Sequence, residues 1–156
     1  MNRLLKLALP LALLAATAST ALADKAAENA IKARKAQMQL YAFNLGSLGA
    51  MAKGDAPYEA EAASALAANM NALANLKTMT MWPQGSDSTA MPDMTRAKAE
   101  AWTTWPAIGE KQKDLETAVA ELIKVAGNGQ AALGEGLKAV GGACGGCHKA
   151  YRDENK

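Results

Sequence analysis

The chain has 156 residues, of which 17 are Lys or Arg and 15 are Asp or Glu, and half of its residues are apolar. Two of the basic residues, Arg3 and Lys6, lie in the first 23 residues, which hold no acidic residue, so residues 24–156 are balanced in charge. Such a balance gives no electrostatic reason to expect nucleic-acid binding. The length suits one domain with a single core.

The N-terminus carries the three parts of a secretory signal peptide. A basic start precedes an apolar stretch over residues 7–16, and the segment ends in Ala21-Leu22-Ala23. This stretch is short for a bilayer span, and Pro10 interrupts it, which argues against a membrane anchor. We therefore expect residues 1–23 to be cleaved, residues 24–156 to form the mature domain in the periplasm, and the mature protein to have no membrane span.

The rest of the chain predicts helices. It holds only three Ile and three Val and no alternating run of β-branched residues, so it offers little from which to build strands. Apolar residues at steps of three and four predict four helices. We place them at residues 26–53, 58–79, 95–126 and 130–151. Four amphipathic helices with two short connections predict an all-α fold, a four-helix bundle.

Turn residues separate the predicted helices. Gly54–Pro57 ends the first helix, and Trp82-Pro83 with the polar loop 84–93 follows the second. Pro106 lies inside the third pattern and removes a backbone donor, so we expect a kink near Trp102 or a fresh start at Trp105. The sequence also predicts several large side chains in the core: Met51, Met70, Met79, Trp102 and Trp105.

Cys144-Gly145-Gly146-Cys147-His148 is the C-x-x-C-H motif of covalent haem attachment. Two thiols three residues apart on a helical turn match two vinyl groups, and the next residue carries an imidazole under the iron. Zinc would need about four ligands, a disulfide would close too small a loop to constrain the chain, and a thioredoxin-like pair belongs early in an α/β domain. The motif predicts one haem c, held by Cys144 and Cys147, with His148 as the proximal iron ligand.

The opposite side of the iron is left open by the residues themselves. His148 is the only histidine in the chain, which excludes a second histidine ligand. Methionine, lysine, a non-ligating residue, water or a gas can face the iron there.

At this point the sequence resembles the class II c-type cytochromes, which comprise cytochrome c′ and its low-spin, methionine-ligated relatives. The matching pieces are Arg34-x-x-x-Met38, residues 51–58, Trp82-Pro83 and residues 144–152. The resemblance implies that Met38 lies on the distal face of the haem, as the sixth ligand in the low-spin relatives or as a lid in cytochrome c′. It also implies that Arg34 lies near a haem propionate and that Arg152 lies beside the proximal face. Family members occur as monomers and as homodimers.

Two functions follow from these alternatives. Iron bound by His148 and Met38 suits an electron carrier that serves redox partner proteins. A five-coordinate iron with Met38 as a lid would instead bind nitric oxide or carbon monoxide. No distal histidine exists to move protons and no carboxylate pair stands out, so we expect no enzyme. The sequence thus predicts a periplasmic electron carrier, with gas binding as the alternative.

Overall fold

The computed structural model describes residues 8–154, and these residues form helices and connecting loops. The long helices are α1 (Ala8–Lys53), α2 (Ala60–Ala74), α4 (Ala107–Val125) and α5 (Gln130–Tyr151). A 3₁₀ turn, η1 (Met79–Met81), and a short helix, α3 (Glu100–Thr103), lie between α2 and α4. The described residues form no strand, and a single isolated antiparallel bridge joins Ala97 to Arg152. The predicted all-α class is confirmed.

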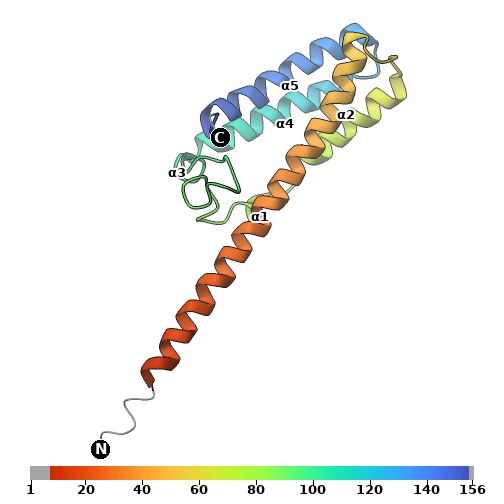
Figure 1. Cartoon of the computed structure of the whole chain (residues 1–156). Coiled ribbons are helices and arrows are strands. Elements are labelled where there is room, and N and C mark those ends of the chain that lie inside the picture. The colour runs from red at the N-terminus through yellow and green to blue at the C-terminus, as the bar shows by residue number, and fades with distance from the viewer. Residues whose placement is uncertain (1–7, 155–156) are drawn as a thin grey trace, which may run out of the picture.

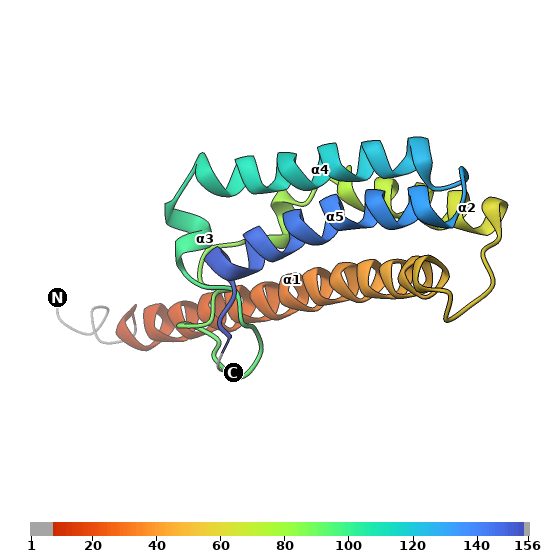
Figure 2. The same ribbon diagram turned by 90° about the horizontal axis from the view of Figure 1, so that it is seen from above.

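The four long helices form one bundle, and α1 projects beyond it at the N-terminal side (Figures 1 and 2). Helix α1 packs against α2 and α5, and α4 packs against the same two helices. Each long helix therefore has two neighbours, which closes the ring of a four-helix bundle around one core. Among the described residues, no helix combines the length and apolar character needed to cross a membrane.

The core takes residues from all four long helices. Its fully buried large side chains are Leu48 of α1, Met70 of α2, Val119 and Leu122 of α4, and Leu133 and Val140 of α5. These positions recur at helical spacing, so each helix turns one apolar stripe inward. The expected core role of Met70 is confirmed.

Helix α1 begins earlier and α2 ends earlier than the sequence predicts. Helix α1 is continuous from Ala8, so the predicted cleavage point after Ala23 falls within it, and residues 1–7 of the predicted signal lie outside the described residues. Helix α2 stops at Ala74, where the Asn75 side chain donates to Asn71 O and Gln112 Nε2 donates to Ala74 O. Those side chains satisfy carbonyls that another helical turn would have used.

Met79 is wrongly predicted as a core residue, and Trp105 lies outside the helical core. Met79 lies past the end of α2 and is 80% exposed. The predicted third helix is divided into α3 and α4, and Trp105, in the connection, is 74% exposed. Pro106 has no backbone donor and α4 starts directly after it, at Ala107. A new helix thus starts at Ala107, two residues later than expected. Trp105 therefore precedes the helix and does not belong to its apolar stripe.

Helices α4 and α5 approach closely at Gly136. A Cβ atom at Gly136 would lie 2.9 Å from Leu122 Cδ1 and 3.0 Å from Val125 Cγ2, and Leu122 is fully buried. A Cβ at Gly134, two residues earlier on the same helix, would meet no described atom within 4 Å. The close contact of the two helices therefore depends on glycine at position 136.

We predict that Gly136→Ala and Gly134→Ala change stability in opposite directions. Gly134→Ala should raise the free energy of unfolding by about 0.5–1 kcal/mol, because alanine favours the helix. Gly136→Ala should lower it by about 1 kcal/mol, because crowding in a packed core outweighs that gain. Urea unfolding of the purified protein measures both. Equal stabilisation by the two substitutions would show that α4 and α5 are not in close contact here.

Candidate haem-binding site

The C-x-x-C-H motif lies on the last two turns of α5, where Cys144 packs against the edge of the core and His148 is exposed. Cys144 and Cys147 are half-buried free thiols, and His148 is exposed. Burial raises the pKa of both thiols, and the neighbouring Cys144 raises that of Cys147 further, so both are protonated at neutral pH. The helix places the two sulfur atoms on one face, with the imidazole beginning the next turn.

The same part of α5 is open to a large group. It carries four glycines: Gly141, Gly142, Gly145 and Gly146. A Cβ atom built on any of them would meet no described atom within 4 Å. A flat ring system can therefore approach the backbone beside the two cysteines. The donor set of two free thiols and one exposed imidazole fits haem c, and the residues described contain no cluster of His, Cys, Asp or Glu able to hold a metal ion by itself.

Met38 lies on α1, the helix that neighbours this part of α5. Helix α1 packs against α5, and Tyr41, one turn after Met38, interacts with Cys144. The Tyr41 side chain is buried, and its hydroxyl has no hydrogen-bond partner among the described residues. Gln37 lies nearby and lowers the pKa of Tyr41, against the effect of burial. Burial, with a contribution from Cys144, raises the pKa of Tyr41 to about 12. Met38 itself is 45% exposed, so its thioether is not part of the core.

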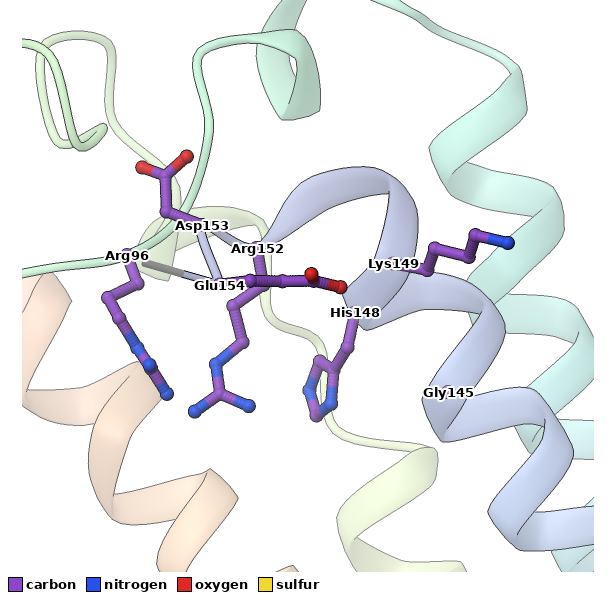
Figure 3. A pocket seen from close by; sticks show the side chains of 7 residues that line it. All are labelled: Arg96, Gly145, His148, Lys149, Arg152, Asp153 and Glu154. Atoms are coloured by element: carbon purple, nitrogen blue, oxygen red, sulfur yellow. The ribbon is translucent and has the colours of Figure 1, made fainter. Parts of the chain in front are cut away.

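A cavity of about 320 Å³ opens beside His148 at the end of α5. It is lined by Gly145, His148, Lys149, Arg152, Asp153, Glu154 and Arg96. The side chains of His148, Arg152 and Arg96 extend in the same direction, whereas those of Lys149 and Asp153 point away from them (Figure 3). Arg152 thus lies beside the candidate iron ligand, and its place beside the proximal face of the haem stays a prediction.

Arg96 is a residue of this site that the sequence did not indicate. It lies in the connection before α3, more than fifty residues from His148 along the chain. The backbone bridge between Ala97 and Arg152 carries it there, and Asp153 N donates to Arg96 O at 2.8 Å. No motif or periodicity marks such a position, because it is set by a contact between two distant segments.

Arg34 is buried in a network of its own, one turn before Met38. Its Nη1 atom donates to Met81 O at 2.7 Å and to Ser86 Oγ at 2.8 Å, and its Nη2 atom donates to Ser86 O at 2.6 Å. The guanidinium also stacks on Trp82 at 4.6 Å and on Trp102 at 5.4 Å. Burial lowers the pKa of Arg34 to about 10, opposed by Asp87. These partners belong to the segment after α2, except Trp102, which lies in α3, and the predicted propionate contact stays a prediction.

With this geometry in place, comparisons with known proteins identify the fold and the cofactor. The family model described as Cytochrome C′ matches residues 29–152. The chain belongs to the cytochrome c′ family. A cytochrome c-554 of Cereibacter sphaeroides is 35% identical over 134 residues, covering 82% of this chain and 96% of the relative. A cytochrome c′ of the same species is 36% identical over 140 residues, covering 90% and 93%.

A solved structure of a cytochrome c′ also matches this chain. Cytochrome c′ from Rhodobacter sphaeroides matches with a TM-score of 0.80 at 35% identity, and the match covers 83% of this chain and 98% of that one. The family binds one covalently attached haem c with its iron, so the chain is a monohaem c-type cytochrome. Its homologues are typically periplasmic, and the family comprises electron carriers and gas-binding proteins.

We predict that Arg34→Ala lowers the free energy of unfolding by about 3 kcal/mol, because it leaves Met81 O and Ser86 O without their charged donor. Lys35→Ala is the matched control, since Lys35 is the next residue on α1 and is exposed. It should change stability by no more than about 0.5 kcal/mol. Urea unfolding of both variants makes the comparison. Equal small effects would mean that the buried contacts of Arg34 contribute little to the fold.

Proposed function

We propose that this protein is a periplasmic electron carrier whose haem iron is bound by His148 on one side and by Met38 on the other. The observation that carries the proposal is the position of Met38. Its apolar thioether is 45% exposed on α1, although buried neighbours such as Ile31 and Leu48 on the same helix pack inside. Leu40 and Phe43 on the same helix are more exposed than Met38, so exposure alone does not single it out. Met38 is singled out because it lies one turn before Tyr41, which interacts with Cys144.

The residues of α5 would hold the cofactor. Cys144 and Cys147 would each hold the haem through a thioether bond, with the thiol proton taken up by the same vinyl group. Cys144 is fixed by packing against the core, which anchors one edge of the ring, and the glycines leave its face free. His148 offers its imidazole from the next turn. Because attachment is covalent, the cofactor stays in place when the bundle opens locally.

A histidine and a methionine form the ligand pair that suits electron transfer. The haem supplies iron that changes between two oxidation states. His148 and Met38 belong to two different helices of a packed bundle, which would hold them in similar positions in both oxidation states. The end of α5 at His148 is exposed, so a redox partner protein would have access to the edge of the haem there. The basic and apolar N-terminal segment supports export, with cleavage after Ala23.

The exposure of Met38 also favours a second function. A side chain that the core does not fix can stand over the iron without binding it, as a lid. In that arrangement the protein would bind nitric oxide or carbon monoxide instead of carrying electrons. The two functions differ in whether the thioether sulfur is bonded to the iron in the resting protein, and spin state reports that bond.

We predict that the exported protein carries one covalently bound haem and begins at Asp24. Protein made in a host competent for c-type cytochrome maturation is denatured, extracted with acidified organic solvent and weighed by mass spectrometry. The mass should equal residues 24–156 plus one haem. In Cys144→Ser/Cys147→Ser, the haem should be extracted completely. A haem-free mass for the wild type would contradict the role given to the two cysteines.

We predict that Met38→Ala converts a low-spin protein that binds gases slowly into a high-spin protein that binds them rapidly. In the wild type, release of the sulfur should limit binding, so the association rate for carbon monoxide should rise by about ten-fold or more in the variant. Met79→Ala is the matched control, because Met79 is 80% exposed and lies outside the site. It should leave spin state and rate unchanged.

Stopped-flow mixing of the reduced proteins with carbon monoxide measures these rates. A wild type that is already high-spin and binds the gas as fast as Met38→Ala would contradict ligation by Met38. Gas binding would then be the better account of the function.

A further inference from the structure

One segment of the chain touches both helices that carry the candidate iron ligands. We call residues 79–98 the strap. The strap follows α2 and precedes α3, and it lies at the end of the bundle where α5 finishes and α1 passes by (Figures 1 and 2). It makes its contacts with α1 at its start and with α5 at its end.

The attachment to α1 is made by Arg34. Its guanidinium donates to Met81 O at 2.7 Å and to both oxygen atoms of Ser86, at 2.8 Å and 2.6 Å. Ser86 is fully buried, and its hydroxyl donates in turn to Pro83 O at 2.7 Å. A guanidinium is planar and holds several N–H donors in a rigid arrangement, so it fixes the orientation of the loop atoms that it binds. A lysine ammonium has no such rigid arrangement of donors. Helix α1 is thereby held against the strap one turn before Met38.

The attachment to α5 is made by the backbone. Lys98 N donates to Tyr151 O at 2.9 Å, and Asp153 N donates to Arg96 O at 2.8 Å, which forms the bridge between Ala97 and Arg152. Arg152 N donates to His148 O at 2.9 Å. The end of α5 is thereby held against the strap one turn after His148.

The two attachments are joined inside the strap. Ser88 N donates to Ala97 O at 2.7 Å, so the part that binds Arg34 is bonded directly to the part that binds Arg152. The path from α1 to α5 therefore runs through short hydrogen bonds and very few intervening residues. It begins one helical turn from Met38 and ends one turn from His148.

We propose that Arg34 is a positioning residue for Met38, and that the strap sets how far Met38 lies from His148 across the haem. The inference rests on the proposed placement of these two residues on opposite sides of the iron. A thioether–iron bond is weak and short in reach, so a small shift of α1 decides whether the sulfur binds the iron or only covers it. Arg34 acts on that choice through the strap and the position of α1, without touching the iron.

The test separates this role from a direct effect of Arg34 on the haem. Arg34→Gln removes the guanidinium, and Arg34→Lys keeps the charge without the fork. Ser88→Pro removes the N–H that joins the two halves of the strap and leaves Arg34 in place. Lys35→Gln is the matched control, because Lys35 is an exposed neighbour on α1. Each substitution is made in the haem-loaded protein, in the wild-type background and again with Met38→Ala.

Spin state and the association rate of carbon monoxide are measured for every variant, with helix content followed by circular dichroism. Arg34→Gln and Ser88→Pro should each raise the rate by about ten-fold, Arg34→Lys by less, and Lys35→Gln not at all. With Met38→Ala present, none of the four should change the rate further, since all of them act through Met38. Should Arg34→Gln fail to fold with haem, Ser88→Pro still breaks the path at a different point, and Arg34→Gln serves in the same way should Ser88→Pro fail.

Two results would overturn the proposal. One is a wild-type rate in both Arg34→Gln and Ser88→Pro. The other is the same change in rate with and without Met38→Ala, which would mean that Arg34 acts on the haem directly. The spin state of the wild type tests the electron-carrier function separately. A high-spin wild type would refute ligation by Met38, yet the strap would still set the position of Met38 as a lid, and the same dependence on Met38 would be observed.

Discussion

Helix α5 must serve two opposite requirements along one short stretch of chain. Its inner stripe, with Leu133 and Val140, is fully buried in the bundle core. Its last two turns must also present two thiols and an imidazole next to a backbone that a flat ring can approach, although Cys144 packs against the edge of the same core. Glycines on the outer side satisfy the second requirement at a cost in helix propensity. Packing against α1 and α4 compensates for that cost, so the site depends on the bundle being intact.

The other half of the site is far from α5 in sequence, and its position depends on tertiary contacts. Met38 lies on α1, which packs along α5, and Tyr41, one turn after Met38, interacts with Cys144 where the two helices meet. The end of the bundle near His148 is tied together by the loop after α2, through Arg34 on one side and the backbone of Arg152 on the other. A small change in that loop can therefore alter the distance between the two candidate ligands without changing either of them. On the proposed placement of Met38, such a change would decide whether its sulfur binds the iron or only covers it.

The sequence predicted the parts of this structure that depend on local signals. Helix α5 was placed at its observed bounds because Gly129 and the residues after Tyr151 delimit a continuous apolar pattern. The motif of Cys144, Cys147 and His148 is local as well, since one helical turn fixes its geometry. The bundle follows from four amphipathic segments and short turns.

What the sequence could not show depends on contacts between distant segments. Helix α2 ends early because Gln112, from another helix, satisfies its last carbonyl. Trp105 is exposed because the chain restarts after Pro106. Arg34 is bound by loop atoms about fifty residues away, and Arg96 reaches His148 through a backbone bridge. None of these partners can be read from spacing along the chain.

The central claim is that α1 and α5 supply one iron ligand each, Met38 and His148. The absorption spectrum of the purified wild-type protein, recorded in the oxidised and the reduced state, tests it most directly, because spin state depends on whether both ligands are bound. The account predicts a six-coordinate, low-spin haem in both states. A five-coordinate, high-spin spectrum in either state would contradict ligation by Met38.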